Sequence, residues 1–307
     1  MSGKSAIKHD IALAAVLCAM LTAGSFFDRE ISQALYMPLN VPFLTITVAG
    51  QYVFFSAFIF FAGVLLRQAS VCGTIGGKKK QFYKIACAYL SLSTGMIGSA
   101  AVLHYECIGA FFPDTEFSLL FVFIFCMLFM YPLMFVGFAV GPRKYDSSLV
   151  ELLIRMLVLI TVGASFIGLL KLFLARPRFR YTVAGYDGVG FTPWYMPIQN
   201  AGELMTMHGM DINCFQSLPS GHALMGMSSI YIFPVLARIF PGLKNKETTL
   251  RITGLIYGLA VMLSRIVLGA HYLSDVAIGA LLSLLFGNAV LRFRCGNIVN
   301  NRKNKSK

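Results

Sequence analysis

Charged side chains are scarce in this chain of 307 residues, in which Asp, Glu, Lys and Arg together make up only 13%. Soluble globular domains carry about a quarter charged residues, so this scarcity excludes an ordinary soluble protein. Hydrophobic residues supply 57% of the sequence, and its mean hydropathy is +0.72. Both values are typical of an integral membrane protein.

Cysteine pairs with metal-ligand spacing are also missing. The seven cysteines include no Cys-x-x-Cys pair, so their spacing indicates neither a zinc site nor a redox site. We accordingly predict no metal site and no cofactor. Cys107 and Cys214 both fall on the outer side in the orientation derived below, which leaves a disulfide between them open as an alternative to two free thiols.

Long apolar runs are what the sequence has in abundance. A helix needs about 20 apolar residues to cross a bilayer core of roughly 30 Å. Gly, Ser and Thr recur within the runs, as close helix packing in lipid favours. We therefore predict an all-α, polytopic membrane helix bundle of about eight transmembrane spans. The spans cover residues 10–27, 46–66, 83–104, 118–140, 149–172, 222–240, 251–269 and 273–291.

The first apolar run has two explanations. Lys4 and Lys8 precede it, as in a signal peptide, but no clear small-x-small cleavage site follows, and the charged residues 28–30 come directly after it. We expect a retained membrane anchor. The segment 28–45 is predicted to form a short interfacial helix followed by a turn that contains proline.

The net charge of +13 would suit a nucleic-acid partner, but its distribution argues against one. With both termini in the cytoplasm, 20 of the 26 basic residues lie on the cytoplasmic side, as the positive-inside rule requires. We therefore expect membrane lipids and no nucleic acid as partners. The six remaining basic residues are Arg29, Lys171, Arg176, Arg178, Arg180 and Arg265, and five of them cluster at two outer helix ends.

The chain divides by composition into three parts. Residues 1–148 hold about four N-terminal spans, residues 149–291 hold the polar motifs described next, and residues 292–307 form a basic tail expected in the cytoplasm. The long outer segment 179–218 is rich in aromatic residues and contains the only tryptophan. Such a segment forms either a belt at the membrane interface or a lid over a site.

Three short polar stretches stand at the outer ends of apolar helices. Residues 171–180 close the fifth span, residues 219–222 (Pro-Ser-Gly-His) open the sixth, and residues 264–275 connect the last two. Each alone has an ordinary structural explanation: snorkelling cations, a serine cap, and a buried pair formed by His271 and Asp275 four residues apart on a helix. In the predicted orientation, however, all three lie at one depth on one side.

Together the three stretches indicate phosphate chemistry. Ionisable residues at membrane depth are costly and usually mark function. Cations and the amides of a helix N-terminus bind phosphate, while two histidines supply a nucleophile and an acid. No pair of carboxylates offers a divalent metal site, so arginine and lysine would have to offset the phosphoryl charge.

These residues resemble the type 2 phosphatidic acid phosphatase (PAP2) superfamily. Its signature is Lys-x6-Arg-Pro, Pro-Ser-Gly-His and Ser-Arg-x5-His-x3-Asp, and this chain matches it over 171–275, with flanking helices extending the resemblance to 149–291. Phe179 stands where the family usually has proline. The common form of the family has six spans, so two spans here look like an N-terminal addition.

The resemblance implies a role for each matching residue. His271 would attack phosphorus and form a phosphohistidine, Asp275 would fix its tautomer, and His222 would protonate the leaving alcohol. Arg176 also precedes a proline, but its spacing from Lys171 is two residues short, so Arg178 is favoured as the motif arginine. The residues that would hold the phosphate are Lys171, Arg178, Ser220, Gly221 and Arg265.

The function expected from this resemblance is metal-independent dephosphorylation of a membrane lipid phosphate or diphosphate, at the non-cytoplasmic face of a bacterial inner (plasma) membrane. A lipid phosphotransferase with the same intermediate is the nearest alternative. A transporter or scaffold without chemistry would not explain two histidines beside three cations, and the eight apolar runs argue against a soluble haloperoxidase with a similar motif. The sequence leaves the lipid headgroup and the oligomeric state open.

Overall fold

The computed structural model describes residues 3–73, 76–103, 108, 118–196 and 198–292. Within these residues the chain is almost entirely helical, and the only β-type pairing is one isolated bridge. The helices are α1 (Gly3–Leu35), α2 (Val41–Val71), α3 (Gly77–Leu103), α4 (Leu119–Phe125), η2 (Cys126–Met130), α5 (Tyr131–Val140), α6 (Ser147–Phe173), α7 (Phe179–Thr182), α8 (Ala201–His208), η3 (Ile212–Phe215), α9 (Gly221–Ile239), η4 (Pro241–Leu243), α10 (Glu247–Val267) and α11 (Leu273–Arg292).

Eight stretches of helix in the described part of the chain are long and apolar enough to cross a membrane, which confirms the predicted all-α bundle of eight spans. They differ from the predicted ranges by a few residues at most ends, because the helices continue past the apolar runs. The observed stretches are Lys8–Leu35, Val41–Val71, Gly77–Leu103, Leu119–Val140, Ser147–Lys171, Gly221–Ile239, Glu247–Val267 and Leu273–Leu291.

The first helix carries a kink that matters for the site. Phe27 has non-helical backbone angles (φ −128°, ψ 15°), so α1 consists of two helical pieces. The kink falls where the predicted first apolar run ends, and the piece after it contains the expected short helix. Leu39 then adopts a positive φ of 61° in the turn that leads to α2. Asp28 is therefore the first residue beyond the kink.

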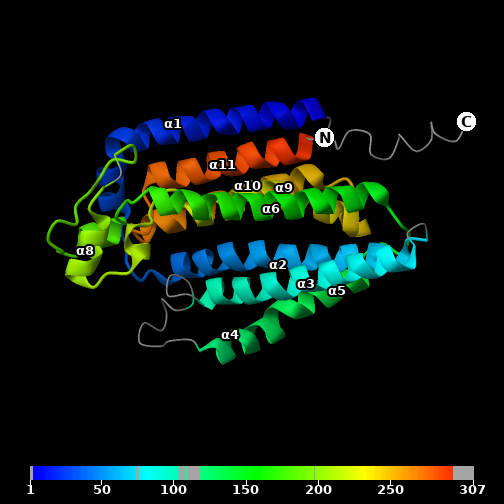
Figure 1. The fold of residues 1–307 in the computed structure, drawn as a ribbon. Helices are drawn as coiled ribbons and strands as arrows, with labels where there is room; N and C mark the ends of the chain where they lie inside the picture. Colours follow the sequence, from blue (N-terminus) through cyan, green and yellow to red (C-terminus); the bar gives the residue numbers. More distant parts are fainter. Residues whose placement is uncertain (1–2, 74–75, 104–107, 109–117, 197, 293–307) are drawn as a thin grey trace, which may run out of the picture.

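The long helices run side by side (Figure 1). The N-terminal end of α1 and the C-terminal end of α11 lie at one end of the bundle, and α8 with its flanking loops lies at the other.

Close helix contacts depend on glycine. A Cβ added at Gly254 of α10 would overlap the carbonyl oxygen of Ser229 in α9. One added at Gly137 of α5 would overlap the carbonyl oxygen of Phe60 in α2. The spans thus pack through small residues, as in other membrane bundles.

One hydrophobic core joins the N-terminal spans to the C-terminal ones. It includes Leu17 of α1 and Phe58 of α2 together with Met156, Met227 and Leu284 of the C-terminal helices. Many large apolar side chains on the outside are exposed, Leu119 and Leu120 among them. An exposed apolar surface of this kind suits contact with lipid chains.

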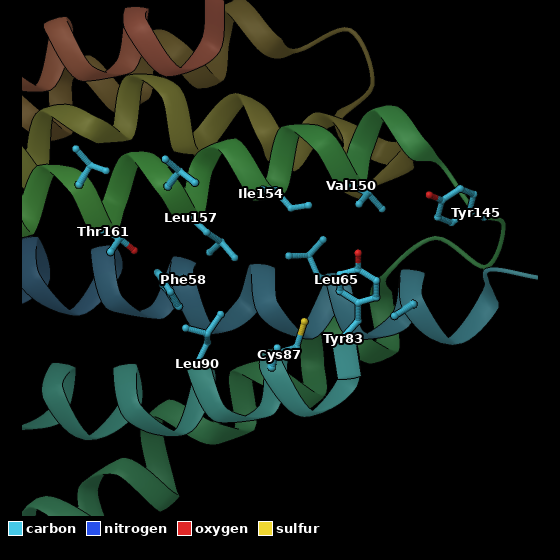
Figure 2. Close-up of a pocket in the computed structure, with 14 residues that line it drawn as sticks. Phe58, Leu65, Tyr83, Cys87, Leu90, Tyr145, Val150, Ile154, Leu157 and Thr161 are labelled. Carbon is cyan, nitrogen blue, oxygen red and sulfur yellow. The ribbon is translucent and has the colours of Figure 1, made fainter. Parts of the chain in front are cut away.

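An apolar pocket of about 540 Å³ lies between α2, α3 and α6. Figure 2 shows side chains such as Phe58, Leu90 and Leu157 pointing into it, with the hydroxyl groups of Tyr83 and Tyr145 toward one end. No lysine, arginine, histidine or carboxylate lines it. The pocket therefore lies apart from the polar motifs and has no cationic side chain that would offset the charge of a phosphate.

Candidate active site

The first motif returns across the end of the bundle as an extended segment. After α6 ends, the backbone of residues 176–178 pairs with residues 214–217: Arg176 N donates to Phe215 O (2.7 Å), Ser217 N to Arg176 O (3.1 Å), and Arg178 N to Cys214 O (3.0 Å). A proline at 177 keeps the residue before it out of the helical region. This pairing sets the first motif directly beside the chain that leads into the second.

The second motif forms the start of α9. Ser220 is the N-cap, and its Oγ accepts a hydrogen bond from Ala223 N (3.3 Å). His222 follows in the first turn and is buried. Ser220 N donates to the carbonyl oxygen of Asp275 (3.1 Å), and a Cβ at Gly279 would overlap the carbonyl oxygen of Ser220. The first turns of α9 and α11 are thus joined, and the α9 N-terminus presents amides of the kind that bind anions.

The third motif crosses the turn between α10 and α11. Gly269 has a φ of +62°, the left-handed conformation that a glycine adopts easily, and its carbonyl oxygen accepts from Arg180 N (3.0 Å). His271 N donates to Arg265 O (3.1 Å). Arg265, His271 and Asp275 are all at most 1% exposed. The turn therefore brings the third motif against the first with its ionisable groups buried.

The nucleophile candidate His271 is held mainly by a backbone group. Its Nδ1 lies 2.5 Å from the carbonyl oxygen of Ser217 and 3.9 Å from Asp275 Oδ2. We expected His271 and Asp275 to share a helix face and to hydrogen bond; instead His271 lies in the turn before α11, so the helical spacing does not apply and 3.9 Å is too long for a hydrogen bond. A carbonyl acceptor selects a proton on Nδ1, which places the lone pair of the neutral ring on Nε2.

Asp275 is linked to His271 through Ser217, which hydrogen bonds to both residues. Ser217 Oγ and Tyr272 N donate to Asp275 Oδ2 at 2.5 Å and 2.9 Å. Arg176 Nη1 donates to Asp275 Oδ1 at 2.6 Å. The carboxylate thus fixes Ser217, whose carbonyl group contacts the imidazole. Sequence reasoning missed Ser217, which lies two residues before the Pro-Ser-Gly-His motif and has no distinguishing feature of its own.

Arg176 is the centre of a buried polar cluster. It contacts both Asp275 and Asp28 of α1, the latter through Nη2 at 2.9 Å, while its Nε donates to Thr192 O (2.9 Å). Its guanidinium lies over the ring of Tyr272, with 4.0 Å between Cζ and the ring centroid. Burial disfavours its charge, but Asp275 and Asp28 outweigh this effect and raise the pKa of Arg176 above its ordinary value. Arg176 is therefore a structural cation.

The residues predicted to hold phosphate lie at the same end of the bundle. Lys171 stands in the last turn of α6 and is half-buried. Arg178 is buried, and its Nε donates to Asn213 O at 2.6 Å. Arg265 is buried, with Nη1 3.5 Å from Thr47 Oγ1 of α2. Because Arg176 is committed to two carboxylates, this arrangement favours Arg178 over Arg176 as the motif arginine.

The aromatic segment 179–218 packs against the candidate site. Arg176 lies 5.7 Å from the ring centroid of Phe191, and Trp194 Nε1 donates to Ser25 Oγ of α1 (2.9 Å). The segment also has a small core of its own that contains Leu204 and Phe215. These contacts favour a cover over the site rather than an interfacial belt.

Two features of the sequence fall outside the described residues. Cys214 is described and is buried, but Cys107, with which it could form a disulfide, is not among the described residues. The basic tail beyond residue 292 also lies outside them.

Phe179, which stands where the family usually has proline, is buried. Its ring makes edge contacts with Tyr36 (5.2 Å between centroids) and Tyr272 (6.1 Å). Packing thus fixes the turn that a proline would otherwise stiffen.

Comparison with known protein families gives a match, which covers the C-terminal half of the chain. The model of the PAP2 superfamily matches residues 152–298, a range that contains all three motifs. Comparisons with curated proteins and with solved structures gave no match. The matched range begins in α6, so it leaves α1 to α5 outside. The resemblance inferred from the motifs is confirmed: residues 152–298 of this chain match the PAP2 superfamily.

Proposed function

We propose that the protein removes the phosphate of a membrane lipid through a phosphohistidine intermediate on His271, without a metal ion. The match to the PAP2 superfamily and the eight apolar helices support a phosphatase-type activity in a membrane protein. The observation that carries the finer proposal is the contact between His271 Nδ1 and Ser217 O at 2.5 Å. It supports a buried imidazole whose Nε2 lone pair can attack phosphorus.

In the first step, His271 Nε2 forms a bond to phosphorus while the bond between phosphorus and the lipid oxygen breaks. The departing alkoxide is a strong base, and His222 donates a proton to it, so the lipid leaves as an alcohol. His271 then carries the phosphoryl group and a positive ring. Asp275 lies 3.9 Å from the ring nitrogen Nδ1 and offsets that charge.

In the second step, a water molecule attacks the phosphorus of the phosphohistidine. His222 accepts the proton of the water, the bond to His271 Nε2 breaks, and phosphate is released. Lys171, Arg178 and Arg265, together with Ser220 and the amide of Gly221, are proposed to hold the phosphoryl oxygens in both steps.

The substrate is proposed to be a lipid phosphate or diphosphate, such as phosphatidic acid, phosphatidylglycerophosphate, a polyprenyl diphosphate or a glycolipid. The motifs lie at one end of eight apolar helices, so lipid tails can stay in the bilayer while the headgroup reaches the site. The excess of basic residues at the other ends supports a site that faces the non-cytoplasmic side of a bacterial inner membrane.

A panel of lipid phosphates, assayed with the purified protein in detergent, tests this function directly. We expect release of inorganic phosphate from at least one headgroup. Adding a candidate alcohol acceptor should leave phosphate release unchanged. If phosphate appears only on the acceptor, the protein is a phosphotransferase; if no headgroup is turned over, the proposal fails.

Activity is expected to survive a large excess of a strong chelator. Both carboxylates of the buried cluster, Asp28 and Asp275, are engaged by Arg176, and the described residues contain no group of three His, Cys, Asp or Glu that could hold a metal ion. Initial rates with and without chelator provide the measurement. A loss of rate that magnesium restores would contradict the mechanism.

Vanadate should inhibit the same reaction competitively with the lipid, because it adopts the five-coordinate geometry of phosphoryl transfer and carries negative charge for the same cations. Sulfate at equal ionic strength serves as the control, since it screens charge but does not adopt that geometry.

A further inference from the structure

Asp28 lies outside the matched residues 152–298 but contacts the polar cluster of the candidate active site. It belongs to α1, directly after the kink at Phe27, and is 2% exposed. Its Oδ2 accepts from Arg176 Nη2 at 2.9 Å, and its Oδ1 accepts from Ser274 N at 2.9 Å. Ser274 Oγ also donates to the carboxylate. The first helix is thus tied to two residues that surround Asp275.

The contacts of Asp28 select its ionised form. Arg176 Nη2 and the backbone amide of Ser274 can only donate. Ser274 Oγ accepts from Arg176 Nη1 at 2.9 Å, so its own proton is directed to Asp28. A carboxylate satisfies all three donors, whereas a protonated acid would bring a further proton to a site of donors.

The charge of this cluster depends on Asp28. Arg176 contacts both Asp28 and Asp275, so the three side chains together carry one net negative charge. Without Asp28, the charges of Arg176 and Asp275 would cancel. His271 gains a positive charge when its Nε2 bonds to phosphorus while Nδ1 keeps its proton. A neighbouring cluster with a net negative charge stabilises that state more than a neutral cluster does.

We propose that Asp28 is a positioning residue of the active site, which holds Asp275 through Arg176 and supplies the negative charge that phosphorylation of His271 requires. The inference rests on the proposed function, because it concerns the intermediate of that reaction. It also gives α1, which lies outside the matched residues 152–298, a role in the chemistry as well as in anchoring the chain.

The same helix provides a matched control. At the other end of α1, Asp10 is buried and forms an ion pair with Arg251 of α10. Asp10 therefore also ties α1 to the bundle through an arginine, but far along the helix from the motifs. Asp10→Asn removes a buried ion pair of α1 and leaves the active-site cluster intact. A purely structural role for Asp28 predicts that both variants behave alike.

The test compares Asp28→Asn with Asp10→Asn in the full chain, purified in detergent and assayed on the best lipid phosphate of the panel. At a separation on the order of 10 Å and an effective dielectric constant of about 20, one unit charge changes a barrier by a factor of roughly 15. We expect Asp28→Asn to lower kcat about 10- to 50-fold with KM within about twofold. Asp10→Asn should keep kcat within about twofold.

Rapid quenching and conservative variants separate charge from packing. The acid-labile phosphoprotein should form more slowly in Asp28→Asn by the same factor as kcat, while Asp28→Glu, which keeps the carboxylate, should recover most of the rate. If Asp28→Asn fails to fold, Asp28→Ser removes the charge without placing an amide against Arg176, and the same loss is expected.

The outcomes distinguish this inference from the proposed function. A wild-type protein that releases no phosphate overturns both. An active wild type in which Asp28→Asn and Asp10→Asn share one kcat overturns the role of Asp28 alone, as does a loss that appears only in KM.

Discussion

Replacing His271 with alanine is expected to lower phosphate release by about 10⁴-fold or more with every substrate, because the change removes the nucleophile itself. The side chain is 1% exposed, and its Nδ1 is fixed by Ser217 O. The loss should be equal for a lipid monophosphate and for nitrophenyl phosphate. Steady-state kcat/KM on the two substrates measures it.

Replacing His222 with alanine should affect the two substrates differently. A general acid contributes about 10²- to 10⁴-fold when the leaving group is poor. A lipid alkoxide is a poor leaving group, whereas nitrophenolate needs almost no protonation. His222→Ala should therefore lose most of its rate on the lipid and recover a large part of it on nitrophenyl phosphate. Rapid quenching with the activated substrate should still trap acid-labile phosphoprotein in this variant, but not in His271→Ala.

His208 provides the control for both histidine variants. It lies in α8 at the same end of the bundle, and its Nε2 contacts Asp187 O at 2.8 Å. It belongs to none of the three motifs, so His208→Ala should keep wild-type rates on both substrates. Reversed patterns for His222 and His271 would show that their roles are exchanged. Wild-type rates in both would place the site elsewhere.

The fold was predictable from the sequence because the bilayer imposes a length and a composition on each span. Eight apolar runs gave eight spans, and charge bias placed the three motifs at the same end. The kink in α1 was signalled by the change at residues 27–28 from apolar to charged. The helix ends were less predictable, since a helix continues beyond the apolar residues that cross the membrane.

Contacts between distant segments could not be predicted. In the sequence the charged residues 28–30 mark only the end of the first span, and nothing in their spacing relates Asp28 to Arg176, which is 148 residues away. The position of His271 illustrates the same limit. A spacing of four suggests a shared helix face, but Gly269 at positive φ ends α10 and leaves His271 in a turn.

Arg176→Gln and Arg178→Gln are expected to have different effects: the first should mainly lower stability, and the second should mainly lower activity. Arg176→Gln leaves the buried carboxylates of Asp28 and Asp275 without their cation, and breaking a buried pair in this way costs about 3–5 kcal/mol. A fall in Tm on the order of 10 °C should follow. Arg178→Gln removes a hydrogen bond from a charged group to Asn213 O, worth about 1.5–3 kcal/mol, so it should destabilise the protein less than Arg176→Gln and mainly lose activity on the lipid.

A double variant tests whether Arg176 is the cation that Asp28 and Asp275 share. In the wild-type protein, Asp28→Asn removes a partner of Arg176 and should lower the Tm. In Arg176→Gln the same change removes one of two unpaired buried carboxylates and should raise the Tm, because Asp275 no longer faces a like charge. This reversal of sign requires that the two acids share one arginine, which no independent pair of contacts would produce. Additive effects of the two changes would show that Asp28 and Asp275 do not depend on one shared arginine. A stable and inactive Arg176→Gln beside an unstable Arg178→Gln would identify Arg176 as the arginine that binds the phosphate.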